Sequence, residues 1–363
     1  MPESSSILDF PSSFPAILNP PSSCSNARFP TPSSILDPDH NTSKHDNPRP
    51  TRYSASSQMI PLLLKRLFHG LLVLWVVATL TFLLLRLAPG GPFDSERKLP
   101  PEVLANLEAK YHLDRPLFQQ YLLYLSGIAR GDFGPSYKYL DRGVTRIIAE
   151  TLPTSALLGA LALLFAIVGA FPIGLLAAYY RGSLIDRCCL LVATLGISLP
   201  NFILGALLIW AVALQLGWLQ AGRWDDWSSA ILPTITLGAA PAAYLAVLLR
   251  STLIETLGED FIRTARAKGL KESVVLVKHA LAHSLIPVLT VMGPLTAALL
   301  TGSFVVEYVF AIPGMGRFFI SAVTDRDYPL IMGVTLVYTA LLVCANFVVD
   351  MLYGYADPRI RTR

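Results

Sequence analysis

Residues 151–180 read TLPTSALLGALALLFAIVGAFPIGLLAAYY, thirty positions without a single Asp, Glu, Lys or Arg. About 20 apolar residues in a helix are enough to cross the hydrocarbon core of a bilayer. A spanning segment has no water to satisfy its backbone, so it must close its hydrogen bonds internally. We therefore expect this stretch to be a transmembrane helix.

The composition of the whole chain agrees with a membrane protein. Of the 363 residues, 53% are hydrophobic and only 15% are charged, and the mean hydropathy is +0.51. Soluble domains usually carry about 25% charged residues. The net charge of +4 is small for this length and gives no reason to expect a nucleic-acid partner.

Five further stretches are also uncharged and long enough to span. They are residues 67–85, 188–222, 227–249, 284–306 and 328–349. The stretch 188–222 is too long for one straight span and too short for two spans with a turn, and Pro200-Asn201 interrupts it. We interpret it as one kinked helix with an interfacial end, which makes six spans in an all-α integral membrane protein.

The charges of the connections predict the orientation, because short cytoplasmic loops collect Lys and Arg. The connection at 88–150 balances eight basic against eight acidic residues and is expected outside. Every second connection is basic, which places both chain termini in the cytoplasm. The basic residues on that side are Lys65, Arg66, Arg181, Arg187, Arg263, Arg266, Lys268, Lys271, Lys278, Arg359, Arg361 and Arg363.

The chain divides unevenly along its length. Residues 1–58 are rich in Ser and Pro and lack periodic apolar positions, so they cannot bury a core. They are either a disordered extension or the product of a mis-assigned start, with Met59 as the true first residue. After them we expect a first helix at 59–87, an outer loop domain at 88–150, a five-helix core at 151–354 and a cytoplasmic tail at 355–363.

The predicted spans hold no acidic or basic side chain from the second to the sixth. Charged groups at membrane depth mark proton and ion pathways, so a coupled carrier is disfavoured. A membrane enzyme is disfavoured too, because no catalytic or metal-binding constellation is visible and the four cysteines lack metal-site spacing. Neutral polar residues remain for an aqueous path, and as pathway candidates we name Asn201, Thr236 and Thr296.

No Gly-x-x-x-x-Gly-Lys-Ser/Thr loop occurs, so we expect no ATPase site and no directly bound cofactor. Energy for transport would come from another polypeptide, which draws attention to the cytoplasmic loop at 250–283. Residues 257–270 predict a short helix with acidic Glu259 and Asp260 first and Gly269 as its stop. Phe261, Ala265 and Gly269 recur every four residues and form one stripe along the helix. Its small residues would let the backbone of another element approach closely. The helix could lie on the lipid surface or dock a soluble partner.

The outer connection also contains helical patterns. Val103, Leu104 and Leu107 have helical spacing. A second set, Phe118, Tyr121, Leu122 and Leu125, repeats it. Two amphipathic helices are expected there, either to meet a partner or to cap the pore.

The loop resembles a known family. The run FIRTARAKGL at 261–270, followed by His279-Ala280-Leu281 and Ile286-Pro287, is similar to the cytoplasmic loop of ABC importer permeases of the binding-protein-dependent dipeptide/oligopeptide class. The general family pattern has Glu-Ala-Ala where Arg263-Thr264-Ala265 stand here. Further matching motifs are RLAPGGP at 86–92, GDFG at 131–134, EYVFAIPGMGR at 307–317 and RDYP at 326–329. Together they resemble the first permease subunit of oligopeptide transporters.

This resemblance implies the type I ABC importer permease fold and a place in the cell inner membrane. It implies a second permease subunit, two cytoplasmic ATPase subunits that hydrolyse ATP, and an external peptide-binding protein as partners. It implies a coupling helix that includes Phe261, Arg263, Ala265, Arg266, Lys268 and Gly269. A family motif at the outer end of the fifth span would include Glu307, Phe310, Pro313, Gly314, Gly316 and Arg317. Oligopeptides are the expected cargo, with dipeptides or nickel as the alternative within the family.

Overall fold

The computed structural model describes residues 54–93, 101–139, 142–300 and 302–356, without the side chains of 54–63, 101, 103–105, 350 and 352–356. The described residues from 57 onward form one compact unit. In the part of the chain so described, the regular elements are all helices, with no strand and one isolated bridge between Pro135 and Gly143. The expected all-α class is confirmed. The predicted extension at 1–58 and tail at 355–363 lie almost wholly outside the described residues.

Among the described residues, five helices are long and apolar enough to cross a bilayer, and a bent pair makes a sixth candidate. The helices are α1 (Ser54–Leu87), α4 (Val144–Tyr179), α7 (Trp227–Leu257), α10 (Leu281–Leu300) and α13 (Tyr328–Ala356). All six predicted spans therefore have counterparts, but α7 runs eight residues past the predicted end at 249. The predicted span at 227–249 has no charged side chain, but the longer helix α7 also contains Arg250 and Glu255.

The bent pair corrects the interpretation of 188–222 as a single kinked helix. Helix α5 (Leu184–Ser198) stops before Pro200, and α6 (Asn201–Leu208) starts after it, with a 108° bend between them. Leu199 is extended (φ −80°, ψ 119°), as expected for the residue before a proline. The π-helical turn η1 (Ile209–Gln215) continues α6. Proline was correctly identified as the break, but the chain changes direction there far more than a kink allows.

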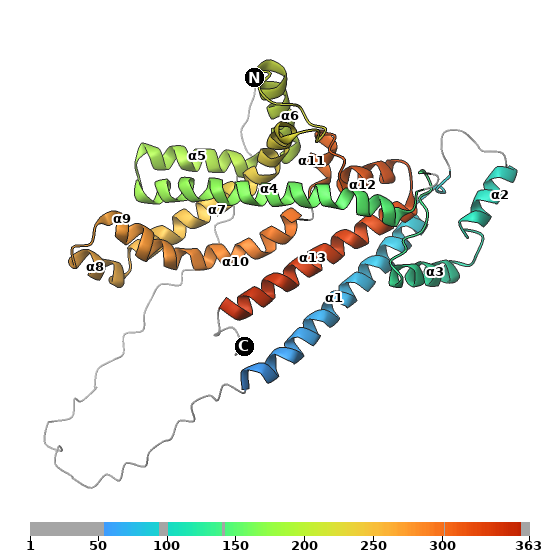
Figure 1. The fold of residues 1–363 in the computed structure, drawn as a ribbon, viewed down its shortest axis with the longest axis horizontal. Helices are drawn as coiled ribbons and strands as arrows, with labels where there is room; N and C mark the ends of the chain where they lie inside the picture. Colours follow the sequence, from blue (N-terminus) through green and yellow to red (C-terminus); the bar gives the residue numbers. More distant parts are fainter. Residues whose placement is uncertain (1–53, 94–100, 140–141, 301, 357–363) are drawn as a thin grey trace, which may run out of the picture. The chain divides into compact units, whose positions relative to one another are not determined.

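The core is built on small residues where α4 and α7 cross. An added Cβ at Gly174 of α4 would lie 2.8 Å from the carbonyl oxygen of Ala246, and one at Gly238 of α7 would lie 2.8 Å from that of Ala162. Such close backbone approach is the usual basis of helix association in membranes. Helix α5 packs against both, with Gly196 facing Ala243, and Figure 1 shows it running alongside α4.

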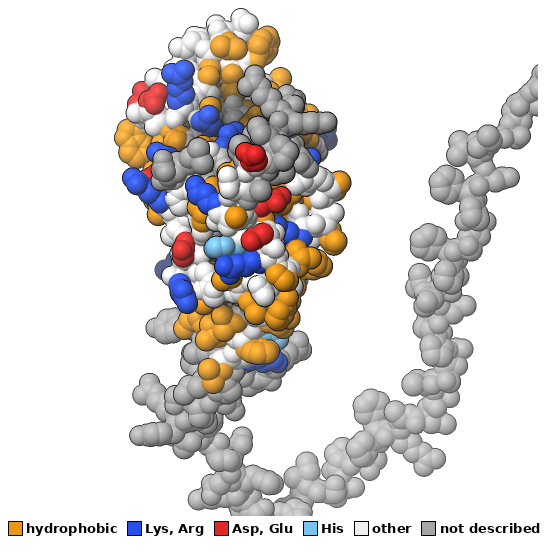
Figure 2. Space-filling view, turned by 90° about the vertical axis from the view of Figure 1, so that its right-hand side faces the viewer, with side chains coloured by type: hydrophobic (Ala, Val, Ile, Leu, Met, Phe, Trp, Pro, Cys, Tyr) orange, Lys and Arg blue, Asp and Glu red, His pale blue; other side chains and the backbone are white. Residues whose placement is uncertain are grey.

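Two short helices lie in the connection between α1 and α4, as the sequence predicts. They are α2 (Pro101–Lys110) and α3 (Leu117–Ala129). The side chains of Val103 and Leu104 lie outside the described set. Tyr121 of α3 hydrogen-bonds Thr79 of α1 at 2.7 Å. Figure 2 shows acidic and basic side chains interspersed on the side of the molecule that carries these helices, in agreement with the balanced charge of the connection.

The connection between α1 and α4 is tied to the start of α13 by a buried carboxylate. Asp327 is fully buried and accepts hydrogen bonds from the Ser136 hydroxyl and, at 3.1 Å, from the Tyr137 backbone N–H. Burial raises the pKa of Tyr137 to about 12, so this ring stays neutral at physiological pH. The shorter helices α11 (Phe304–Val309) and α12 (Met315–Thr324) complete the same end of the molecule.

Candidate functional site

The loop between α7 and α10 contains a short helix, α8 (Asp260–Ala267). Glu259 is its N-cap, and the chain leaves the helix through Gly269, whose φ of +75° is the left-handed conformation that glycine adopts without strain. The predicted start and stop signals are therefore confirmed. After α8 come α9 (Glu272–Val274) and the π-helical turn η2 (Val275–Ala280), which leads into α10.

Helix α8 is held against the bundle by one face. Ile262 is fully buried and Ala265 is 8% exposed, and both belong to a cluster that includes Leu253 of α7 and Val275 of η2. Sequence reasoning missed Ile262, although its spacing of three from Ala265 is the ordinary signal of a buried helical face. Because Ala265 faces the protein's own core, the predicted stripe of Phe261, Ala265 and Gly269 is not one open surface.

The opposite face of α8 is exposed. It carries Asp260, Arg263, Thr264 and Ala267, which we call the outer face of α8. Arg263 and Asp260 pair at 3.2 Å, but their side chains are 74% and 94% exposed, so the pair adds little stability. The outer face is polar, with one small residue, Ala267, at its centre.

The remaining predicted coupling residues flank this face. Phe261 is 40% exposed and its ring centroid lies 4.8 Å from that of His283. Arg266 donates two hydrogen bonds to Glu272, at 2.6 and 3.1 Å, and this contact raises the pKa of the guanidinium above its usual value. The pair fixes the turn after α8, while Lys268 is exposed.

Polar contacts join the helices beneath α8. The Ser284 hydroxyl of α10 donates to the Thr256 hydroxyl of α7 at 3.0 Å, and the Thr252 hydroxyl donates to the Ser284 carbonyl at 3.3 Å. Arg250 of α7 forms two bonds to Asp186 of α5, at 2.7 and 2.8 Å. Sequence reasoning missed this ion pair, whose members are 64 positions apart. A displacement of α8 would therefore move α5, α7 and α10 together.

The predicted outer motif is a buried structural centre. Glu307 is fully buried, and its Oε2 accepts a hydrogen bond from the Gly316 N–H at 2.7 Å. An added Cβ at Gly314 would lie 2.2 Å from the same oxygen, so any larger residue would displace the buried carboxylate. The Ser155 hydroxyl of α4 accepts from the Met315 N–H at 2.8 Å, which joins the motif to the bundle.

The other motif residues divide between core and surface. Phe310 is buried, and its ring lies 3.1 Å from where a Cβ on Gly205 of α6 would stand, so the motif holds the bent pair in place. Pro313 is exposed, and so is Arg317, whose guanidinium donates to the Ala311 carbonyl at 3.3 Å. The sequence predicted these positions as a motif but not that its glycines enclose a carboxylate.

The three pathway candidates lie on three different helices. Asn201 is the first residue of α6 and is partly exposed. Thr296 lines an apolar cavity of about 550 Å³ between α10 and α13. Thr236 of α7 is fully buried and its hydroxyl donates to the Leu232 carbonyl at 2.8 Å, so it cannot line a path in this conformation. Within the described residues no group of three or more His, Cys, Asp or Glu side chains could hold a metal.

Known proteins match nearly all of the chain after residue 58. Residues 170–362 match the family described as binding-protein-dependent transport system inner membrane component, and residues 59–158 match its N-terminal family. The oligopeptide transport system permease protein OppB of Haemophilus influenzae is 44% identical over 305 residues, which cover 84% of this chain and 100% of that protein.

Two further relatives are similarly close. The dipeptide transport system permease protein DppB of Bacillus subtilis is 44% identical over 303 residues, covering 84% of this chain and 98% of that protein. OppB of Escherichia coli strain K12 is 41% identical over 305 residues, which cover 84% of this chain and 100% of that protein. This chain is therefore a member of the binding-protein-dependent transport system inner membrane components.

Proposed function

We propose that the chain is the permease subunit of an ATP-driven importer that moves peptides across the cytoplasmic membrane. The supporting observation is its 44% identity, over the full length of the relative, to an oligopeptide permease. Oligopeptides are the first candidate cargo. Dipeptides are the second, because the relative named for dipeptide transport is equally similar.

The proposed complex contains a second permease subunit, two ATPase subunits and an external binding protein. The chain itself would hydrolyse nothing, and ATP would be used by the ATPase subunits. Its proposed arrangement is a first helix at 59–87, an outer domain at 88–150, a core at 151–354 and a tail at 355–363. Both termini and the loop at 250–283 would face the cytoplasm, in keeping with the basic side chains there.

Helix α8 is the proposed coupling element. Its outer face would sit against an ATPase subunit, and Ile262 would transmit the movement of that subunit to the bundle. Because hydrogen bonds and an ion pair join α5, α7 and α10, these helices would turn as one body between inward-open and outward-open states. The amphipathic helices α2 and α3 would meet the binding protein on the other side of the membrane.

The proposed path carries no fixed charge. Asn201 and Thr296 are the candidates with partly exposed side chains, and both are neutral. Peptides vary in side chain and carry both charges at their ends, so a neutral path could pass them without holding one tightly. Selection would then rest with the binding protein.

Uptake of labelled peptides tests this proposal. A strain lacking the gene should lose uptake of a labelled tripeptide to hexapeptide series, and the restored gene should recover it. Uptake should stop when ATP is depleted while the proton gradient is kept. A secondary carrier would show the reverse dependence, and uptake that survives without ATP would refute the proposal. Recovery of dipeptide uptake alone would favour the second cargo.

A further inference from the structure

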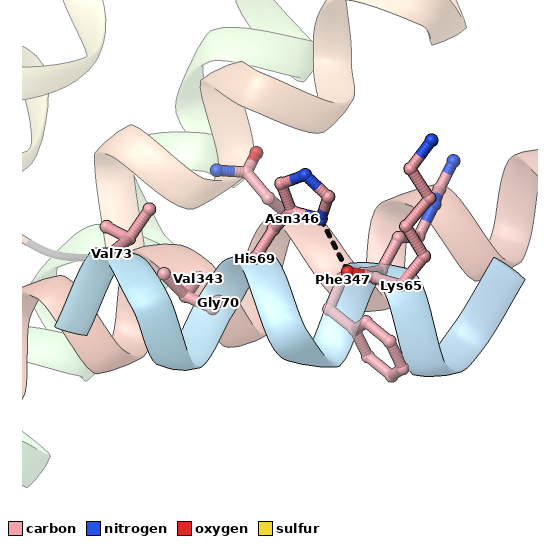
Figure 3. A pocket seen from close by; sticks show the side chains of 8 residues that line it. Lys65, His69, Gly70, Val73, Val343, Asn346 and Phe347 are labelled. Atoms are coloured by element: carbon pink, nitrogen blue, oxygen red, sulfur yellow. Dashed lines mark hydrogen bonds between the residues drawn. The ribbon is translucent and has the colours of Figure 1, made fainter. Parts of the chain in front are cut away.

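A cleft opens between α1 and α13 at the end of α1 that begins its apolar span. It has a volume of about 410 Å³, which lies within the range of small-molecule sites. On α1 its walls are Lys65, His69 and Val73, which follow one another at intervals of four and so share one helix face. Figure 3 shows this face with Asn346 reaching toward it from α13.

One end of the cleft is cationic and polar. Lys65, Arg66, His69 and Asn346 line it. The His69 Nδ1 lies 2.6 Å from the Lys65 carbonyl oxygen, and because a carbonyl only accepts, Nδ1 must carry the proton. This contact fixes the ring and leaves Nε2 of the neutral imidazole as an acceptor, so the donors at this end are the lysine and asparagine side chains. Lysine ammonium and asparagine amide groups are natural donors to a phosphate.

The other end of the cleft is apolar and narrow. The helices come close at Gly70, where an added Cβ would lie 2.7 Å from Val343 Cγ1. Val73 and Val343 form its wall at this end, whereas Phe347 lies beside Lys65 at the cationic end (Figure 3). From Lys65 to Val73 the helix rises about 12 Å. The cleft therefore runs from a cationic mouth into an apolar seam along the helix axis.

We propose that this cleft binds an anionic phospholipid, with the headgroup phosphate at Lys65 and Asn346 and an acyl chain along Val73 and Val343. The charge of the mouth is complementary to a phosphate, and basic pockets between membrane helices favour anionic headgroups. The uncharged run of α1 starts directly after Lys65 and Arg66, so the mouth lies at headgroup depth and the seam in the hydrocarbon. The lipid joins α1 to α13, which otherwise touch at few points.

Native mass spectrometry of the full chain, purified with the subunits that accompany it, tests the proposal. The probes are phosphatidylglycerol and phosphatidylcholine, which share the phosphate but differ in net charge. The chain should retain one phosphatidylglycerol through delipidation and release phosphatidylcholine. Lys65→Gln should weaken retention about fivefold, the effect of one lysine near an anionic headgroup.

Matched variants separate this site from general surface binding. Lys271→Gln removes a lysine outside the cleft and should retain the lipid. Val73→Trp fills the seam from a half-exposed position and should abolish retention, whereas Val76→Trp, which does not line the cleft, should not. Equal retention of both lipids, or unchanged retention in Val73→Trp, would overturn the proposal. So would the absence of any retained lipid, which would mean that a partner helix covers the cleft.

Discussion

Replacing Ile262 by Asp is expected to abolish ATP-dependent uptake while the protein stays in the membrane. Ile262 is fully buried between α8 and the bundle, in the cluster with Leu253 and Val275. Losing this contact and burying a carboxylate there costs on the order of 3 kcal/mol or more. Helix α8 would detach from the helix bundle, and a movement of an ATPase subunit would no longer move the membrane-spanning helices. Peptide uptake at equal membrane abundance is the measurement.

Two control variants separate detachment of α8 from general damage. Ile262→Val keeps the apolar contact and should retain most of the uptake, because this change costs about 1 kcal/mol. Ser273→Asp adds the same charge at an exposed position of α9 and should leave uptake near normal. Normal uptake by Ile262→Asp would show that the packing of α8 against the bundle is not needed for coupling.

Replacing Asp186 by Ala should give the largest loss of thermal stability. The side chains of Asp186 and Arg250 are 5% and 22% exposed, and two hydrogen bonds join them. Removing one member of a buried pair leaves the other charge uncompensated, at a cost of about 3 kcal/mol. Asp186 also accepts the Gly182 N–H at 2.8 Å, a bond that would be lost as well. The measurement is the apparent Tm of the purified protein in detergent.

The chain offers its own comparison for this experiment. Arg146 and Glu150 are bonded at a similar 2.8 Å, but their side chains are 71% and 45% exposed. Glu150→Ala should therefore leave the Tm nearly unchanged. The double variant Asp186→Ala/Arg250→Met removes both buried charges and should recover much of the lost stability. Equal Tm values for Asp186→Ala and Glu150→Ala would contradict a structural role for the buried pair.

Hydropathy predicted most of the architecture because a bilayer imposes one simple rule. Each span needs a long uncharged run, and all six runs found in the sequence have helical counterparts. The ends were less accurate: α7 continues to Leu257 because its last turns pack on α8 and η2, a tertiary contact that local composition does not reveal. The 108° bend at Pro200 was underestimated for a related reason. A proline marks a break, but the angle is set by what α6 packs against, here Phe310.

The candidate site was predicted in position but not in orientation. The stop at Gly269 and the acidic start at Glu259 are local signals, and they located α8 correctly. Which face is buried depends on distant residues such as Leu253 and Val275, so the role of Ala265 was misread. Likewise, nothing local indicates that Asp186 meets Arg250, or that Gly314 and Gly316 surround Glu307.

If the outer face of α8 sits against an ATPase subunit, a photoreactive group on that face should cross-link to the subunit. A photoreactive amino acid at Ala267 is exposed and points away from Ile262. In native membranes it should form a cross-link to an ATPase subunit, whereas the same group at Val277, an exposed position on η2, should not. Cross-links from Ala267 to lipid alone, with none to an ATPase subunit, would contradict the account.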